Sequence, residues 1–433
     1  MSSFLFLLIF GIIFLLLELY VFRILFQFFI NGNSATTDQR GSLLGGYFRD
    51  NKSITLTSVY WIFIIALPVN MYLHLKGFID PYDFKPWIYV NAFFFIFAIT
   101  RFTIALFSGI ADITSFLTNY IGGSLFSEPY NPGRKKFLRK IALLGGMLPF
   151  PTLMYGMIRN PYRYRVMKNT IAIPKLKSDL EGLRIVQISD IHAGSWVFKS
   201  PVETAIKMIN ELDADIVFFT GDLVNYRASE MQPYIDLFSK IKSRYGTYSI
   251  LGNHDYGDYF RWDSEVEKEE NFQQLLEAHK LMGWNLLMNE NSRIQIGKAE
   301  LAIIGVENYS ALPQFPRYGN LSLAYEGSQS ADLRILLSHD PTHWDVEVRN
   351  DFPGIEITLS GHTHGFQFGF EIPGFIKWSP SSLFYNQWAG LYRENDSFLY
   401  VNRGLGYLGY PGRVGILPEI TLIELKKRQK EAV

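Results

Sequence analysis

The chain has 433 residues, with 41 basic residues, 41 acidic residues and no cysteine. A net charge of zero gives no indication of nucleic-acid binding, so we expect no nucleic-acid partner. The lack of cysteine excludes disulfide frameworks, thiolate zinc sites and cysteine nucleophiles.

Apolar and aromatic residues are concentrated in the first third of the chain. Aromatic residues make up 16% of the sequence and include 36 phenylalanines. A chain of this length can form two domains. We therefore predict an α-helical transmembrane region at residues 1–165, followed by a second domain at residues 170–427.

Four apolar stretches are long enough to cross a bilayer as helices. They cover residues 4–30, 54–75, 87–107 and 141–158. The fourth contains glycine and proline, so we expect a kinked or partly re-entrant helix there, and three spans remain the alternative count. No basic segment precedes the first stretch and no small-residue cleavage site follows it. An uncleaved span therefore fits better than a secretory signal peptide.

Charged residues interrupt two of these stretches. Glu18 and Arg23 lie in the first. They either lie near an interface, pair with each other, or form a functional charge within the membrane. Arg101 is late in the third stretch, and we expect its long side chain to reach toward the interface.

The distribution of Lys and Arg predicts the orientation of the spans. The loops on one side carry eight: Arg40, Arg49, Lys52, Arg134, Lys135, Lys136, Arg139 and Lys140. The other side carries six: Lys76, Lys85, Arg159, Arg163, Arg165 and Lys168. The excess predicts a multi-pass protein of the bacterial cytoplasmic (inner) membrane, with its second domain on the extracytoplasmic side. The segment "RKKFLR" resembles a degenerate twin-arginine export signal, although an ordinary basic membrane flank would look the same.

From about residue 168 onward, short apolar runs alternate with amphipathic helices. Strands are predicted at 183–189, 215–220 and 247–252, with helices from residue 201 and at 234–242 between them. A helix at 265–282 precedes strands at 292–296, 300–306, 334–338 and 355–359, and two more strands lie near the C-terminus. This order is typical of an α/β domain with parallel strands. The number of later strands predicts two layers of sheet.

Polar residues follow the predicted strands in short clusters with neighbouring glycines. The clusters include "SDIHAG", "GD", "GNHD" and "SGHTHG". The carboxyl ends of parallel strands share one edge of a sheet, so five loops are expected to deliver these side chains to one place. They are Asp190, His192, Asp222, Asn253, His254, Asp255, His339, His362 and His364.

The chemistry of this set predicts a metal site. Carboxylates, imidazoles and an amide without any thiolate suit Mn²⁺, Fe²⁺ or Zn²⁺. The set exceeds what one tetrahedral ion needs, so we expect two divalent ions, which together can clamp a phosphate during in-line displacement. Five of the eight histidines fall in the clusters, and we interpret the other three, His74, His279 and His343, as structural.

The ordered series D-x-H, GD, GNHD, a single His and GHTH resembles the calcineurin-like metallophosphoesterases, over about residues 180–427. The membrane segment, together with "SDIHAG", "HGFQ" and "VNRGLG", is similar to the bacterial membrane-associated branch called YkuE/YaeI-like. This resemblance implies an α/β/β/α sandwich with a binuclear metal site, and it makes residues 170–427 the catalytic domain. Phe366 stands where that branch usually has glycine, which puts the shape of the substrate groove in question.

The resemblance also implies a role for each residue of the set. Asp190, His192 and His364 would bind the first ion, and Asp222 would bridge both ions. Asn253, His339 and His362 would bind the second ion. His254 would contact the phosphoryl oxygen or protonate the leaving group, and Asp255 would orient His254.

These inferences predict a membrane-anchored, binuclear metal-dependent phosphoesterase. It would hydrolyse a phosphodiester or pyrophosphate bond, and the membrane anchor favours a lipid-linked or cell-envelope substrate. A hydrolase of the UDP-2,3-diacylglucosamine pyrophosphatase type, acting on a lipid A precursor, is one alternative, and a catalytically silent sensor or scaffold is another. Five aromatic residues either line a substrate groove or pack a flap over the sandwich: Tyr256, Tyr259, Phe260, Trp262 and Phe366.

Overall fold

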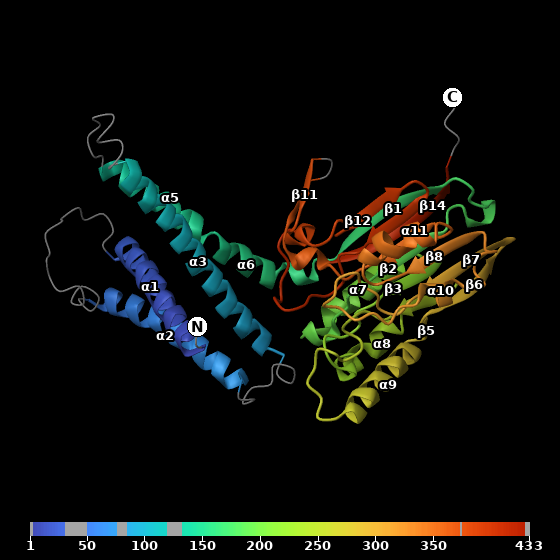
Figure 1. The fold of residues 1–433 in the computed structure, drawn as a ribbon, viewed down its shortest axis with the longest axis horizontal. Helices are drawn as coiled ribbons and strands as arrows, with labels where there is room; N and C mark the ends of the chain where they lie inside the picture. The colour runs from blue at the N-terminus through green and yellow to red at the C-terminus, as the bar shows by residue number, and fades with distance from the viewer. Residues whose placement is uncertain (1–2, 31–49, 76–84, 119–131, 373–374, 429–433) are drawn as a thin grey trace. The chain divides into compact units, whose positions relative to one another are not determined.

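A computed structural model describes residues 3–30, 50–75, 85–118, 132–372 and 375–428 (Figure 1). The chain forms two compact units, Met1–Tyr155 and Gly156–Val433. Three residues used to predict the orientation, Arg40, Arg49 and Lys76, lie outside the described residues, and the side chain of His74 is also not described.

The N-terminal unit is helical. Its helices are α1 (Ser3–Phe29), α2 (Asn51–Leu75), α3 (Trp87–Leu117) and α5 (Pro132–Met147). Helix α6 (Pro149–Ile158) follows α5, and its last three residues belong to the second unit. Among the described residues, four helical segments are long and apolar enough to cross a membrane, in agreement with the predicted count: Gly11–Phe29, Asn51–Leu73, Trp87–Leu117 and Lys136–Tyr162. The last segment is interrupted at Leu148, before Pro149, because proline lacks the N–H that would continue the helical hydrogen bonds.

The structure contradicts the prediction for Arg101 and, among the three alternatives for Glu18 and Arg23, the mutual ion pair. Arg101 is directed into the helical unit, where it is 3% exposed, and its guanidinium lies 2.6 Å from the Glu18 carboxylate. Tyr60 Oη donates a second hydrogen bond to Glu18, at 2.6 Å. Glu18 therefore pairs with α3 and α2 rather than with Arg23, because a buried charge is tolerated only with a close partner of opposite charge.

Breaking this pair is expected to destabilise the helical unit. Arg101→Leu leaves the Glu18 carboxylate buried without its cation, which costs about 3–5 kcal/mol for a buried pair. The measurement is thermal unfolding of the full chain in detergent. Arg139→Ala is the matched control, because Arg139 and Asp112 form a pair that is 47% and 31% exposed, and its loss should cost at most about 1 kcal/mol. Equal effects of the two variants would contradict a stabilising role for the buried pair.

The second unit contains two six-stranded sheets (Figure 1). The strand order in the first sheet is β1 (Arg165–Ile173), β14 (Glu419–Lys427), β2 (Arg184–Ile188), β3 (Ile216–Thr220), β4 (Thr247–Ile250) and β5 (Trp284–Leu286). The order in the second sheet is β12 (Gly390–Glu394), β13 (Ser397–Val401), β9 (Ile357–Ser360), β8 (Leu333–Leu337), β7 (Ala299–Gly305) and β6 (Glu290–Ile296). Strands β2 to β5 are parallel, and β7, β8, β9 and β13 are also parallel.

The two sheets pack face to face over an apolar core, and helices cover their outer faces. Ile185 and Phe218 of the first sheet share this core with Ile335 and Leu359 of the second. Val186, on the opposite face of β2, packs against α7 (Lys199–Glu211), α8 (Ile235–Phe238) and α9 (Glu265–Leu281). The outer face of the second sheet packs against α10 (Leu321–Tyr325) and the π-helix η8 (Trp344–Val348). The α/β/β/α sandwich is therefore confirmed.

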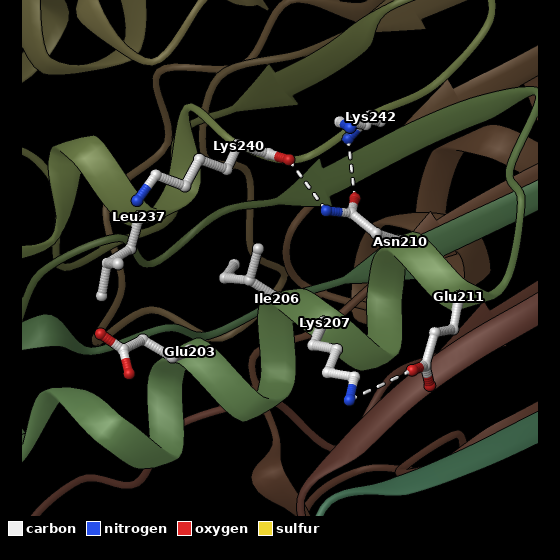
Figure 2. A pocket seen from close by; sticks show the side chains of 8 residues that line it. All are labelled: Glu203, Ile206, Lys207, Asn210, Glu211, Leu237, Lys240 and Lys242. Atoms are coloured by element: carbon white, nitrogen blue, oxygen red, sulfur yellow. Dashed lines mark hydrogen bonds and ion pairs between the residues drawn. The ribbon is translucent and has the colours of Figure 1, made fainter.

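The helix predicted at 234–242 is much shorter in the structure, where α8 covers Ile235–Phe238. The Asn210 side chain binds the backbone beyond it (Figure 2). Its Nδ2 donates to Lys240 O at 2.9 Å, and its Oδ1 accepts from Lys242 N at 2.8 Å. These bonds satisfy backbone groups that a longer helix would have used.

Sequence reasoning also missed several strands at the margins of the two sheets. They are β1, β5, β12 and a separate hairpin formed by β10 (Phe370–Ile372) and β11 (Ile376–Trp378). Strand β5 has only three residues, which is too short for periodicity to detect.

Candidate metal centre

The polar clusters lie where strands of both sheets end. Asp190 and His192 follow β2, Asp222 follows β3, and Asn253 follows β4. Three further predicted ligands follow strands of the second sheet: His339 follows β8, and His362 and His364 follow β9. Because the sheets pack face to face, strand ends from both sheets can contribute to one site.

The structure brings six of these side chains into two groups. The first group is Asp190, His192 and His364. The second is Asp222, His339 and His362. In each group one nitrogen or oxygen from every residue lies within 4.8 Å of the others, so either group could hold a metal ion.

Asp222 connects the two groups. Its Oδ2 lies 3.1 Å from His339 Nε2, in its own group, and 3.5 Å from His192 Nε2, in the other. In the first group, His364 Nε2 lies 3.1 Å from Asp190 Oδ1 and 3.0 Å from His192 Nε2. One carboxylate therefore reaches the donor atoms of both groups, as a bridging ligand must.

The amide of Asn253 is oriented to act as a further ligand. Its Nδ2 donates to Tyr259 Oη at 3.0 Å, while its buried Oδ1 has no hydrogen-bond partner among the described residues. A buried acceptor without a partner costs about 1–3 kcal/mol. A metal ion coordinated by this oxygen would remove that cost, so the residues present fit a metal site.

Neighbouring groups fix which ring nitrogen two of the histidines direct into the site. His339 Nδ1 lies 2.7 Å from Thr220 O, which leaves its Nε2 facing Asp222. His362 Nε2 contacts Tyr385 Oη at 2.8 Å and lies 3.4 Å from Asp340 Oδ2. Such partners orient ligating histidines and raise their basicity.

Tyr385 and Asp340 were missed by the sequence analysis. Asp340 directly follows His339 in the chain, which was the one available signal, whereas nothing in the sequence connects Tyr385 to the site.

His254 lies at the edge of the site, but it is not oriented as predicted. Its Nδ1 lies 2.7 Å from the carbonyl oxygen of Asn225, which leaves Nε2 available. The His254 ring contacts the ring of His192, with 5.0 Å between the centroids. The orienting partner of His254 is therefore a backbone carbonyl and not the Asp255 carboxylate.

Asp255 instead stabilises the loops after β3 and β4 through hydrogen bonds to their backbone. Its buried carboxylate accepts hydrogen bonds, at 2.8–3.3 Å, from four backbone N–H groups: Asp222, Leu223, Val224 and Gly252. Burial and the nearby Asp222 charge raise the pKa of Asp255 to about 7. The prediction that Asp255 orients His254 is wrong because its oxygens are occupied by the backbone.

The backbone at the site is held in an uncommon conformation. Five of the predicted ligands have positive φ angles, between 47° and 72°: Asp190, His192, Asp222, His362 and His364. Such conformations cost about 1–3 kcal/mol each and cluster at functional sites. Two glycines allow the loops to pack this closely, because a Cβ on Gly252 would lie 2.2 Å from Asp222 Oδ1, and one on Gly361 would lie 2.2 Å from Asp190 Oδ2.

The electrostatics favour the protonation states that metal ligands need at Asp190, Asp222, His192 and His362, whereas His339 is held in its protonated form by Asp222. Burial opposes the charge on Asp190 and Asp222, but adjacent histidines hold the pKa of both carboxyls well below the ordinary value. Burial lowers the pKa of His192 to about 3, and it also lowers the pKa of His362. Burial likewise opposes charge on His339, yet the Asp222 carboxylate raises the pKa of His339 to about 10. The carboxylates are thus ionised, and two of the imidazoles are neutral, at neutral pH.

A buried arginine that the sequence analysis did not select lies behind the first group. Arg413 is fully buried, and its Nη2 lies 3.3 Å from His364 Nδ1. The same nitrogen donates to the carbonyl oxygens of Gly404 and Gly406. Arg413 therefore connects the loop between β13 and β14 to His364 of the first group.

The aromatic residues proposed for a groove do not act together. Tyr256 is 8% exposed and packs against Phe272 and Tyr318. Of these five residues, Tyr259 contacts the site, with its ring centroid 4.5 Å from that of His254. For Tyr256, packing is the interpretation that the structure supports.

A shallow hollow beside α7 is separate from the site (Figure 2). Its lining residues include Lys207, Asn210 and Glu211 but none of the predicted ligands. Asn210 is bonded to the backbone of 240–242, and Lys207 lies 3.8 Å from Glu211. These polar groups pair with one another, so the hollow contains no reactive cluster among its lining residues.

The sandwich fold, together with the two Asp/His groups at its strand ends, defines this protein as a candidate metallohydrolase. Residues 183–366 match the protein family described as calcineurin-like phosphoesterase. Residues 2–161 match the family described as probable calcineurin-like phosphoesterase, transmembrane domain. The helical unit and the sandwich therefore match two descriptions that both name this family.

Individual proteins with similar sequences are also named metallophosphoesterases. The metallophosphoesterase YkoQ of Bacillus subtilis is 30% identical over 290 residues, which cover 66% of this chain and 99% of YkoQ. YkuE, from the same organism, is 30% identical over 277 residues, covering 63% of this chain and 90% of YkuE. A transmembrane protein with metallophosphoesterase domain from Danio rerio is 31% identical over 281 residues, which cover 63% of this chain and 60% of that protein. The chain belongs to the calcineurin-like metallophosphoesterase family.

Filling the space that Gly361 leaves open should disrupt the site. A Cβ in Gly361→Ala would lie 1.9 Å from Ser189 Oγ and 2.2 Å from Asp190 Oδ2, so the Asp190 carboxylate must move. We expect metal affinity to fall by about 10- to 100-fold, as it does when ligand positioning is lost. The measurement is bound Mn²⁺ per chain across a titration. Gly109→Ala is the control, since its Cβ meets nothing within 4 Å, and unchanged affinity in Gly361→Ala would contradict the proposed geometry.

Proposed function

We propose that this protein is a membrane-anchored, binuclear metal-dependent phosphoesterase. It hydrolyses a phosphodiester or pyrophosphate bond in a lipid-linked or cell-envelope substrate. The observation that carries the proposal is the pair of buried Asp/His groups joined by Asp222, with the unpartnered Asn253 oxygen beside them. Membership of the metallophosphoesterase family supports the reaction class.

The ligands divide between two ions, which are Mn²⁺, Fe²⁺ or Zn²⁺ by the chemistry of the donors. Asp190, His192 and His364 would hold the first ion. His339 and His362 would hold the second ion together with Asn253, whose buried Oδ1 has no hydrogen-bond partner among the described residues. Asp222 would contact both ions. When bound, the ions supply positive charge to the phosphoryl oxygens and activate water as a nucleophile at neutral pH.

The residues of the chain position the substrate and move a proton. His254 Nε2 is the nitrogen left available, because Nδ1 is engaged by the Asn225 carbonyl. Because Nδ1–H donates to this carbonyl, Nε2 carries a proton only when the ring is protonated. We propose that this imidazolium donates from Nε2 a hydrogen bond to a phosphoryl oxygen or its proton to the leaving group, leaving a neutral ring. Asp222 Oδ1 accepts from the backbone N–H of His254 at 2.9 Å, so the bridging carboxylate also sets the position of this residue.

A catalytically silent sensor or scaffold would be expected to lack a ligand or the histidine of the "GNHD" segment. All seven predicted ligands and His254 are present. The alternative of a hydrolase for a UDP-diacylglucosamine-type lipid uses the same metal centre and differs only in substrate. It needs access to a nucleotide-linked lipid, which places its catalytic domain on the cytoplasmic face.

The proposal is tested by hydrolysis of bis(4-nitrophenyl) phosphate with detergent-purified protein, stripped of metal and refilled with Mn²⁺, Zn²⁺ or Mg²⁺. We expect His254→Ala to keep its metal but lose turnover by about 10²- to 10⁴-fold, because it removes only the proton donor. Asp222→Asn should lose both metal and turnover. Lys207→Ala, on the exposed face of α7, is the control. Stoichiometric metal without hydrolysis of either this diester or a lipid pyrophosphate would favour the scaffold alternative.

We propose the bacterial cytoplasmic membrane as the location, with the catalytic domain on the extracytoplasmic side, from the excess of eight over six basic residues. The lack of native cysteine allows a direct test. In Lys207→Cys the single thiol should react with a membrane-impermeant maleimide on intact spheroplasts. Labelling only after lysis would reverse the orientation and favour the nucleotide-lipid alternative.

A further inference from the structure

The β10–β11 hairpin has its polar side toward the protein and its apolar side toward the surroundings. In this antiparallel pair, Phe370 is opposite Trp378 and Ile372 is opposite Ile376, so these four side chains share one face. They are 38–54% exposed. Phe375, at the described end of the turn, is 85% exposed.

The opposite face of the hairpin carries Glu371 and Lys377, which bind the domain. Glu371 forms an ion pair with Arg403 at 2.6 Å. Lys377 donates to the carbonyl oxygen of Ala389 and to Tyr392 Oη, and burial lowers the pKa of Lys377 to about 8. A hairpin on a water-exposed surface normally has the reverse arrangement, with polar residues outward. The exposed apolar face therefore needs a partner.

Further exposed apolar residues include one that is close in sequence to the metal-centre residue His364. Phe366 lies two residues beyond His364, and its ring is 5.9 Å from that of Phe384. Phe366 and Phe384 are 51% and 62% exposed, and Leu383 is 75% exposed. Phe366 also has a φ of 48°, which costs about 1–3 kcal/mol for a residue with a Cβ. Packing within the protein stabilises the exposed ring of Phe366 only a little, whereas contact with an apolar partner outside the protein would stabilise it further.

Residues 413 and 414 connect α6 to the segment that leads into the β10–β11 hairpin, through contacts that all lie within the second unit. Arg413 N donates to Gly156 O, in α6, at 3.1 Å. The next residue, Val414, bonds to Gln367 O at 2.7 Å and accepts from Gly369 N at 2.9 Å. The last candidate span ends at Tyr162 and β1 begins at Arg165, so only residues 163 and 164 separate the first strand of this unit from that span along the chain.

We infer that the β10–β11 hairpin docks into the surface of the phospholipid bilayer. Phe370, Ile372, Ile376 and Trp378 contact the lipid, and Phe375 enters it most deeply. Lipid is the partner because the same chain carries four candidate membrane spans among its described residues, and because the face is apolar with aromatic residues, which favour the interfacial zone of a bilayer. Docking brings the rim of the metal centre, at Phe366, to the lipid surface.

The test uses the full chain reconstituted in phosphatidylcholine/phosphatidylglycerol vesicles. The absence of native cysteine permits single labels without background. Phe375→Cys and Ile376→Cys each receive an environment-sensitive fluorophore, and Lys207→Cys, whose native side chain is 76% exposed, is the control. Phospholipids carrying a doxyl group act as quenchers. We expect the two hairpin labels to emit at shorter wavelength and to lose most of their intensity to doxyl lipid, while the control label changes little.

Two results would overturn the inference. If the hairpin labels emit like the control label, the face is in water. If they emit at shorter wavelength but resist the doxyl lipid, the face is covered by protein, either a second copy or another part of the chain. The readout does not depend on turnover, so failure of the proposed phosphoesterase activity would be recognised separately.

Discussion

The site depends on the burial of ionised carboxylates beside neutral and charged imidazoles. Asp190 and Asp222 are 0% and 2% exposed, and a buried charge is stable only when nearby groups compensate it. Asp222 receives this compensation from His339, from His192 and from the backbone N–H of His254. The same contacts that stabilise the carboxylate therefore hold residues from several strand ends in one place.

The surrounding loops are organised to maintain these contacts. Asp255 accepts four backbone N–H groups from two of the loops, and Gly252 and Gly361 allow the backbone to approach the carboxylates. The positive φ angles of five predicted ligands show that the loops adopt conformations which the chain would not choose without these constraints. Strain at the site is thus offset by hydrogen bonds just behind it.

A related constraint acts in the helical unit. Arg101, Glu18 and Tyr60 come from three different helices and satisfy one another inside an apolar environment. Hydrophobic packing alone leaves helices free to rotate about their axes, whereas a buried ion pair requires particular faces to meet. The pair therefore favours one arrangement of α1, α2 and α3.

Much of this protein was determined by its sequence alone. Long apolar stretches identify membrane helices because a bilayer requires about 20 such residues, and buried parallel strands followed by Asp, His and Asn clusters predict a shared site at the strand ends. Only the tertiary structure could decide which groups meet across long sequence separations. Glu18 and Arg101 are 83 residues apart, Tyr385 orients a histidine 23 residues away, and Asp255 binds the backbone rather than its neighbour His254. The outward apolar face of the β10–β11 hairpin was likewise invisible in sequence, because alternation shows that a strand has two faces but not which one the folded protein covers.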